Sequence, residues 1–419
     1  MSEPRFLTSD QCRQIAHEFQ TPVYIYEEAA LNKAARDVLA FPAAFGLTAR
    51  YAMKACPTAA LLTLFHDWGL QFDASSGFEI HRAVRAGVPA GHISLSSQEF
   101  PADIVELVNM GIAVNACSLS QLEAFGKAFP GGQIGLRVNP GVGSGGTKKT
   151  NVGGPSSSFG IWHELLDQAE AIITKYSLRV VRIHSHIGSG SDPSVWVKAA
   201  ELTLNQVRRF PDVTNVNLGG GFKVGRMPDE ISTNLQVIGQ PVKEAFEAFA
   251  AETGRELHLE IEPGTYLVAN AGCLLASVQD KTSTGNEGHV FLKLDTGMTD
   301  ILRPTLYAAQ HPMTVIPLES DRSETESVIV VGHCCESGDL LTPDPSDPGL
   351  LKEREFTKAE IGDLFTIDGA GAYCSSMPAK NYNSFPEVPE VLLRENGEFA
   401  LIRKRQTAEQ VYQNEIPLS

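Results

Sequence analysis

Lys54 is the residue whose type and position most clearly suggest chemistry. It follows the largely apolar run 49–53 and precedes Ala55-Cys56-Pro57, where a helix is expected to begin. A lysine between a strand and a helix lies at the carboxyl-end mouth of a β/α unit, where catalytic groups of such folds gather. An amine held in a partly dry mouth loses proton affinity and can bond covalently to an aldehyde cofactor. A solvated surface lysine is the alternative, and only the surrounding residues can decide between the two.

Further polar residues and glycines lie at or near the ends of later expected strands. In chain order they are Asp73, Arg137, His184, His186, Gly219-Gly220-Gly221 and Glu262. The glycines let backbone N–H groups close on a phosphate, which barrels commonly bind after their seventh and eighth strands. Glu262 supplies a carboxylate, and a carboxylate beside a pyridine nitrogen keeps that nitrogen protonated, as an electron-sink cofactor requires. His186 can stack on a flat cofactor, and Ser189 can donate to a phosphate.

Each of these features has a simpler alternative. The triple glycine could form an ordinary turn, and Glu262 could belong to a salt bridge. His184 and His186 could both bind a metal ion, but the sequence offers neither a third histidine nor a pair of carboxylates nearby, so we expect no metal. The occurrence of all these residues at successive strand ends favours one shared site.

The elements that must position this site alternate regularly between residues 25 and 265. The expected strands are 49–53, 70–73, 92–95, 112–116, 133–138, 179–187, 214–218 and 257–262. Strands that alternate with helices over this length favour a closed (β/α)8 barrel of the TIM type, spanning 25–270, over a doubly wound open sheet. An open sheet would need a glycine-rich turn after its first strand, where Lys54 stands instead.

Two stretches depart from this alternation. Residues 140–159 are rich in glycine and serine, and we expect them to form a lid loop on the rim that carries Lys54, with a disordered insertion as the alternative. From residue 271 on, short apolar runs are separated by clusters of Gly, Pro and Asp. This pattern predicts an antiparallel β domain over 271–419, which we expect to include the N-terminal residues 1–24.

The composition restricts the possible partners. A formal charge of −16 over 419 residues argues against nucleic acid and anionic membranes, which both reward basic surfaces. No apolar stretch approaches a membrane span, and the first residues lack the features of a signal peptide. The cysteines are scattered and odd in number, which indicates reduced thiols and a cytoplasmic protein.

Several blocks of sequence, taken together and in order, match a known pattern. They are Tyr51-Ala-Met-Lys-Ala55, His184-Ser-His-Ile-Gly-Ser189, Gly219-Gly-Gly221, Glu262-Pro-Gly264, Arg303-Pro-Thr-Leu-Tyr307, Cys335-Glu-Ser337, Gly371-Ala-Tyr373 and Asn381-Tyr-Asn383. Through these blocks the chain resembles the fold-type III pyridoxal-phosphate decarboxylases, whose barrel is like that of alanine racemase. Among them it is most similar to the diaminopimelate decarboxylases.

The resemblance implies a reaction and a set of roles. The reaction is the decarboxylation of meso-2,6-diaminopimelate to L-lysine and carbon dioxide, the last step of lysine biosynthesis, with pyridoxal 5'-phosphate as cofactor. Lys54 would bind the cofactor covalently, and Cys335 would deliver a proton. Further cofactor contacts would come from Asp73, Arg137, His186, Ser189, Gly220, Gly221, Glu262, Gly264, Thr265 and Tyr373. Substrate contacts would come from Arg303, Tyr307, Glu336 and Tyr373.

The resemblance also implies a homodimer with shared active sites. In this family, the residues that correspond to Cys335 and Glu336 come from the partner subunit. Each active site would therefore need two chains and would take a small amino acid as its substrate.

One position departs from the family pattern. The family usually has an arginine after Glu-Pro-Gly, and that arginine contributes to substrate binding, whereas this chain has Thr265. We hypothesise that Arg226 or Lys148 takes over part of its work, because a missing guanidinium removes a bidentate carboxylate donor. The alternative is another substrate handled by the same chemistry, such as D-lysine, D-ornithine or a siderophore precursor.

Two other classes of protein could also use Lys54 and a phosphate loop. A non-catalytic cofactor carrier would not need a second domain with Cys335, Glu336 and Tyr373. A racemase would need a second base opposite Lys54 and would have no use for Cys335 beside an acidic residue. Both therefore explain less of the sequence than a decarboxylase does.

Overall fold

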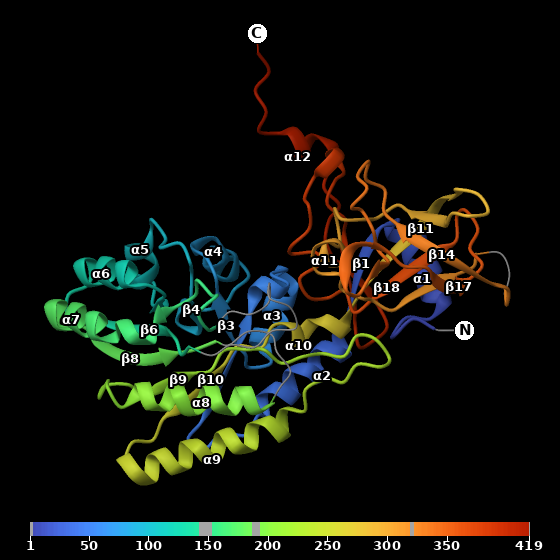
Figure 1. Cartoon of the computed structure of the whole chain (residues 1–419). Coiled ribbons are helices and arrows are strands. Elements are labelled where there is room, and N and C mark those ends of the chain that lie inside the picture. Colours follow the sequence, from blue (N-terminus) through green and yellow to red (C-terminus); the bar gives the residue numbers. More distant parts are fainter. Residues whose placement is uncertain (1–2, 142–152, 187–192, 319–321, 419) are drawn as a thin grey trace. The chain divides into compact units, whose positions relative to one another are not determined.

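The computed structural model describes residues 3–141, 153–186, 193–318 and 322–418 (Figure 1). The chain forms two compact units. The barrel unit comprises Asn32–Val224 and Ile231–Leu267, and the β unit comprises Met1–Leu31, Gly225–Glu230 and Val268–Ser419. Among the described residues, no helix combines the length and the apolar character needed to cross a membrane.

The barrel unit contains eight parallel strands that close on themselves. They are β2 (Leu47–Ala52), β3 (Gln71–Ala74), β4 (Ile93–Leu95), β5 (Ala113–Ala116), β6 (Gln133–Asn139), β8 (Arg179–His184), β9 (Asn215–Asn217) and β10 (His258–Ile261). Each strand pairs with the next, and β10 pairs with β2, so the sheet has no free edge. These strands match the eight expected ones to within a few residues at each end. The predicted TIM-type barrel is confirmed.

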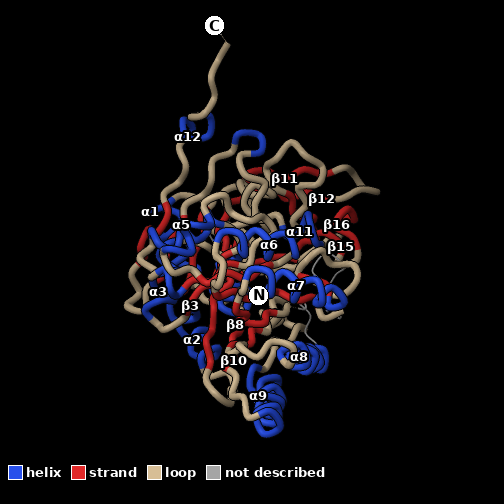
Figure 2. The backbone as a smooth tube through the Cα atoms, turned by 90° about the vertical axis from the view of Figure 1, so that its left-hand side faces the viewer, coloured by secondary structure: helices blue, strands red, loops and turns tan. Residues whose placement is uncertain are grey.

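Helices follow most of these strands and cover the barrel. They are α2 (Glu28–Leu39), α3 (Ala59–Asp67), α4 (Gly77–Arg85), α5 (Ile104–Asn109), α6 (Leu119–Ala128), α7 (Leu166–Tyr176), α8 (Pro193–Val207) and α9 (Leu235–Thr253). In Figure 1 and Figure 2, α6 lies beside α7 and α8 lies beside α9. Ser76 caps α4, because its hydroxyl accepts a hydrogen bond from the N–H of Glu79 at 3.1 Å.

The β unit is built on a sheet that mixes antiparallel and parallel pairs. Its strands are β1 (Val23–Glu27), β11 (Gly272–Ser283), β12 (Val290–Leu294), β13 (Met313–Ile316), β14 (Thr325–Val331), β17 (Arg354–Thr357), β18 (Leu364–Asp368), β19 (Glu390–Leu393) and β20 (Phe399–Arg403). Most pairs are antiparallel, as expected, but β1 pairs with β19 and β12 with β14 in parallel. One parallel pair arises because β1 comes from the N-terminus and lies between β11 and β19.

The N-terminal segment belongs to the core of the β unit. Val23 and Ile25 of β1 are buried together with Leu275 of β11 and Val391 of β19. Residues two apart on a strand face the same side, so these positions form one apolar layer. Helix α1 (Ser9–Phe19) adds Cys12 and Ile15 to it. The smaller elements are β7 (Ile161–Trp162), β15 (Pro343–Asp344), β16 (Asp347–Leu351), α10 (Thr265–Val268), α11 (Arg303–Tyr307) and α12 (Ala408–Tyr412).

The expected lid loop is described only in part, because residues 142–152 lie outside the described ranges. Asn139 holds the described ends on either side together. Its Oδ1 accepts hydrogen bonds from the N–H of Gly141 at 3.1 Å and from the N–H of Gly154 at 2.9 Å. Its Nδ2 donates to the carbonyl oxygen of Gly154 at 3.0 Å. The base of the loop is therefore anchored at the carboxyl end of β6.

Candidate active site

A buried ion-pair layer crosses the barrel below its carboxyl-end mouth. Glu260 on β10 accepts a hydrogen bond from Nη2 of Arg50 on β2 at 3.1 Å and lies 2.8 Å from Nε of Arg182 on β8. Burial alone would raise the pKa of Glu260, but the charges and hydrogen bonds of the two arginines outweigh it and lower the pKa to about 2. The barrel interior thus carries a fixed charge network at this level.

A second polar layer lies nearer the carboxyl-end mouth and contains Glu262, two positions after Glu260. Strand alternation brings the residue two positions further on to the same interior face. Nδ2 of Asn217 donates to Oε1 of Glu262 at 2.7 Å, and Nε2 of His184 lies 3.2 Å from Oε2. Burial would raise the pKa of Glu262, but the interaction with His184 and the nearby charge of Lys54 hold it well below its usual value. Glu262 therefore stays a carboxylate.

The glycine turn after β9 lies directly against the backbone of Glu262. A Cβ on Gly220 would be 2.3 Å from the carbonyl oxygen of Glu262, so only glycine fits there. Gly219 and Gly221 have φ values of 70° and 100°, in the left-handed region that glycine adopts without strain. The expected phosphate turn is thus a tight backbone approach and not a loose surface turn.

His186 faces the same glycine turn. The backbone N–H of Gly220 donates to Nδ1 of His186 at 3.3 Å, so Nδ1 is an acceptor and the proton of the neutral ring is on Nε2. Burial, followed by the charges of Arg137 and Lys54, holds the pKa of His186 well below its usual value. A neutral, flat imidazole is the form suited to lie against an aromatic cofactor.

Asp73 and Lys54 complete the group in the barrel unit. Asp73 is buried on β3, and its Oδ1 has no hydrogen-bond partner among the described residues. Burial and then the charge of Glu262 raise the pKa of Asp73 well above its usual value, while Lys54 and Arg137 oppose that rise. Lys54 is half-buried in the 3-10 turn Met53–Ala55 that follows β2. The structure thus places Lys54, Asp73, Arg137, His186 and Glu262 within electrostatic reach of one another.

This arrangement fits a flat, phosphorylated aldehyde. Asp73 offers an unused buried acceptor, the glycine turn offers space that a Cβ would fill, and Glu262 offers a permanent negative charge. Gly264 and Thr265 follow Glu262 directly, and Thr265 begins α10. Ser189 lies outside the described residues. The guanidinium carbon of Arg137 lies 5.0 Å from the ring centre of Phe159, the last residue of the loop expected as a lid.

In the β unit, two predicted substrate-binding residues share the short helix α11. Arg303 and Tyr307 are its first and last residues, and the Arg303 guanidinium carbon lies 6.0 Å from the Tyr307 ring centre. Thr305 between them donates to the carbonyl oxygen of Gly338 at 2.9 Å. That bond ties α11 to the loop that carries Cys335 and Glu336.

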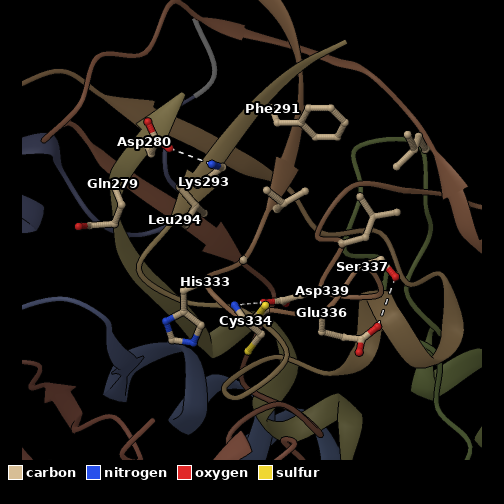
Figure 3. A pocket seen from close by; sticks show the side chains of 15 residues that line it. Gln279, Asp280, Phe291, Lys293, Leu294, His333, Cys334, Glu336, Ser337 and Asp339 are labelled. Carbon is tan, nitrogen blue, oxygen red and sulfur yellow. Dashed lines mark hydrogen bonds and ion pairs between the residues drawn. The ribbon is translucent and has the colours of Figure 1, made fainter. Parts of the chain in front are cut away.

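The loop with Cys335 and Glu336 lines a pocket of about 630 Å³ within the β unit (Figure 3). His333, Cys334, Glu336 and Ser337 lie in the lower half of that view, and Asp280, Lys293 and Phe291 lie in the upper half. The N–H of Cys335 donates to Oδ1 of Asn383 at 2.9 Å, and Oε1 of Glu336 accepts from the N–H of Gly338 at 3.1 Å. The backbone of the loop is thus fixed, while both side chains are exposed.

The two adjacent cysteines differ in their surroundings. Burial, followed by the charge of Asp339, raises the pKa of the Cys334 thiol to about 12. Cys335 is exposed, whereas Cys334 is partly buried, and both line the pocket. Tyr373 has a φ of 56°, and it follows Gly371, where a Cβ would lie 1.8 Å from the carbonyl oxygen of Val268. Tyr373 is therefore held in an uncommon backbone conformation by a crowded turn.

Sequence reasoning missed one residue that the structure makes central. Asn217 was not singled out, although its Nδ2 binds Glu262 and its Oδ1 accepts the N–H of Gly219 at 2.8 Å. Its position two residues before the glycine turn, at the end of a short strand, is the signal that could have identified it. His184 was noted as a strand-end residue and as a possible metal ligand, and its contact with Glu262 joins segments far apart in the sequence.

Comparison with known proteins places these observations in a family. A family model described as the pyridoxal binding domain of pyridoxal-dependent decarboxylases matches residues 31–269. The diaminopimelate decarboxylase of Streptomyces coelicolor is 33% identical over 99% of this chain and 93% of its own length. That of Escherichia coli K12 is 33% identical over 98% of this chain and 97% of its own length.

Solved structures agree with the sequence relatives. A crystal structure of a diaminopimelate decarboxylase matches with a TM-score of 0.91 and 32% identity, over 98% of this chain and 99% of that one. The Helicobacter pylori diaminopimelate decarboxylase, complexed with L-lysine, matches with a TM-score of 0.83 and 26% identity, over 96% and 98% of the two chains. The chain therefore belongs to the pyridoxal-dependent decarboxylases and, among them, to the diaminopimelate decarboxylase family. It is an enzyme of the carboxy-lyase class, and its cofactor is pyridoxal 5'-phosphate.

Proposed function

We propose that this chain decarboxylates meso-2,6-diaminopimelate to L-lysine and carbon dioxide, the last step of lysine biosynthesis. The relatives that match it over nearly their full length carry that activity in their names. The observation in the molecule that carries the proposal is the group formed by half-buried Lys54 with Asp73, His186 and Glu262 at the barrel mouth. An amine, a neutral ring and a fixed carboxylate are the groups that this cofactor needs around it.

In this proposal the barrel unit holds the cofactor. Lys54 would bind it covalently, Glu262 would keep its pyridine nitrogen protonated and His186 would lie against its ring. The amides of Gly220, Gly221, Gly264 and Thr265, together with Ser189, hold the phosphate. Asp73 and Arg137 complete the wall. When bound, pyridoxal 5'-phosphate supplies an electron sink for the pair of electrons released as the carboxylate leaves.

The β unit supplies the groups that recognise the substrate and move a proton. Arg303 binds a carboxylate of the carbon centre that does not react, and Glu336 binds the ammonium group of that centre. Tyr307 and Tyr373 add contacts, and Tyr373 also touches the cofactor. Cys335 delivers the proton to the carbon that has lost carbon dioxide.

We further propose a homodimer in the cytoplasm, in which Cys335 and Glu336 of one subunit serve the barrel unit of its partner. The exposure of both side chains, on a loop whose backbone is fixed by Asn383, supports a role toward another chain. The dimer thus explains why a proton donor stands exposed in a unit with its own compact core.

A substrate panel tests the proposed reaction. Purified holoenzyme is supplied in turn with meso-diaminopimelate, D-lysine, D-ornithine and L-arginine, and carbon dioxide release and product are measured. We expect release from meso-diaminopimelate with L-lysine as the product. Faster release from one of the other amino acids, or inversion at the α-carbon without gas release, would reject the assignment.

A further inference from the structure

Arg226 belongs to the β unit, although it follows the barrel strand β9 in the sequence. Its carbonyl oxygen accepts a hydrogen bond from Nη2 of Arg5 at 2.7 Å, and its N–H donates to Oε2 of Glu230 at 2.8 Å. Nδ2 of Asn270 donates to the neighbouring carbonyl oxygen of Gly225 at 3.0 Å. The backbone at this residue is therefore fixed from several directions.

The side chain of Arg226 is equally well held. It is only 8% exposed, and its Nε donates to the carbonyl oxygen of Gly369 at 2.9 Å. Gly369 has a φ of 66°, and a Cβ there would lie 3.0 Å from Cγ of Arg226. The turn at Gly369 thus leaves room for this one long side chain and orients its guanidinium.

The guanidinium has donors that the described chain does not use. Nη2 of Arg226 is buried without a hydrogen-bond partner among the described residues, and the same is true of Nε of Arg303. An unpaired buried donor costs free energy comparable to a lost hydrogen bond, and more when the group is charged. Among the described residues of the β unit, Nε of Arg13, Nε of Arg322 and Nε2 of His311 are buried and unpaired as well, but Arg226 is the one whose unpaired atom is a terminal guanidinium nitrogen. That nitrogen indicates a missing acceptor.

The positive charge of Arg303 acts on Arg226. Burial, and next the charge of Arg303, lower the pKa of Arg226 to about 9. Burial and then the charges of Arg226 and Arg303 hold the pKa of His311 well below its usual value, so His311 adds no positive charge. Arg226 is buried and Arg303 is half-buried, so their like charges repel, and an anion that binds both would relieve that repulsion.

We propose that Arg226 and Arg303 together bind the carboxylate on the carbon centre of the substrate that does not react. This inference rests on the proposed function and deepens it. Guanidinium groups match carboxylates in a planar, bidentate geometry, and a pair of them can occupy both carboxylate oxygens. Arg226 would also supply the second guanidinium that the chain lacks at position 265, where Thr265 stands in place of the usual arginine.

The test compares two ligands that differ only in that carboxylate. L-lysine carries it, and 1,5-diaminopentane has the same carbon chain and both amines without it. Binding to the holoenzyme is measured by calorimetry. In Arg226→Met, the Kd for L-lysine should rise about 10- to 100-fold, as expected for charged hydrogen bonds. The Kd for 1,5-diaminopentane should not change, and Arg226→Lys should fall between wild type and Arg226→Met.

The matched control is Arg405→Met in the same unit. Nη2 of Arg405 already donates to the carbonyl oxygens of Gln20, Thr21 and Pro22 at 3.1, 3.3 and 3.0 Å, so this variant should keep the preference for L-lysine. Thermal melting of each variant identifies a folding defect. The inference is wrong if Arg226→Met raises the Kd of both ligands by the same factor, or if it leaves the Kd for L-lysine unchanged. A wild type without preference for L-lysine also overturns it.

Carbon dioxide release from meso-diaminopimelate is recorded on the same preparations. If the wild type releases carbon dioxide but Arg226→Met keeps the preference for L-lysine, the role of Arg226 is rejected and the proposed function stands. No release, together with a preference that Arg226→Met abolishes, rejects the proposed reaction and supports the carboxylate site. The two failures are therefore separable.

Discussion

At the scale of single residues, the site depends on charges that the fold fixes before any ligand binds. Asn217 and His184 occupy the two oxygens of Glu262, and the neighbouring amine of Lys54 favours its charged form. His186 is held neutral by burial and by nearby cations. A site arranged in this way needs little reorganisation when charge develops during the reaction, which is the largest single source of rate acceleration in many enzymes.

The adjacent cysteines give the sharpest test of a residue's role. Cys335→Ala should leave the visible absorption of the bound cofactor unchanged and lower kcat by about 10²- to 10⁴-fold, the usual contribution of a positioned general acid. Cys334→Ala is the matched control, because its thiol pKa is raised to about 12 beside Asp339 and it is not expected to deliver a proton. Equal turnover in the two variants would assign the proton to another group.

The neutral histidines predict how stability depends on pH. The folded-state pKa of His186 is lower than its usual value of 6.5, so the unfolded chain binds its proton more readily. The corresponding stability is present above about pH 6.5 and is lost as the pH falls below it. We expect the melting temperature to fall between about pH 7.5 and pH 5.5, and His186→Gln to reduce that fall.

The exposed His17 provides the control for this experiment, since His17→Gln removes an imidazole that lies in solvent. Its melting curve should keep the wild-type dependence on pH. A His186→Gln profile that is superimposable on wild type would show that the imidazole of His186 is not the group that titrates.

At the scale of elements, the glycine turn after β9 is the part most sensitive to added volume. Gly220→Ala places a methyl group 2.3 Å from the carbonyl oxygen of Glu262, so the turn must shift. We expect a loss of about 1–3 kcal/mol in stability, typical of overpacking, and weaker cofactor binding measured by absorbance titration. Gly91→Ala is the control, because a Cβ there meets nothing within 4 Å. Similar cofactor affinity in both variants would contradict the assigned role of the turn.

The strands of the barrel were predictable because their signal is local. Each parallel strand is buried on both faces and therefore reads as a short apolar run between turns. Helix α9 shows where local signals fail: it begins at Leu235, capped by Asn234, and continues through Pro241. Proline inside a helix leaves the carbonyl four residues back without its partner, and Val237 at that position is 61% exposed, so water can take that role.

The contacts between distant segments could not be read from the sequence. Arg226 was named as a candidate only because it is a nearby cation in the sequence. Its membership of the β unit depends on Gly369 and Arg5, which are 143 and 221 positions away. Asn217 was missed for the same reason, since its partner Glu262 lies 45 positions further on. Periodicity reports which face of an element is buried, but not which distant side chain it meets.

At the scale of the whole molecule, shared active sites predict complementation between inactive variants. Lys54→Ala and Cys335→Ala chains should each be nearly inactive, because each lacks one group of every site. Half of a randomly mixed population is heterodimers, and each of these rebuilds one intact site. The mixture should therefore recover about a quarter of the wild-type rate after dissociation and reassociation.

The control mixes Lys54→Ala with Glu262→Gln, which both alter the barrel unit. If sites are shared as proposed, this pair cannot rebuild an intact site, because every barrel carries one defect. No recovery in the first mixture would show that each chain serves only itself. Recovery in this control would show that the rescue does not come from a partner's Cys335 completing an intact barrel unit.

Everything proposed for the site requires that Lys54 is the residue that bonds to pyridoxal 5'-phosphate. Borohydride reduction of the holoenzyme, followed by proteolysis and mass spectrometry, locates the covalently fixed cofactor. We predict the added mass on the peptide that contains Lys54, with loss of visible absorption and of activity in the same sample. A cofactor attached to any other lysine, or no attachment in an active preparation, would contradict the account.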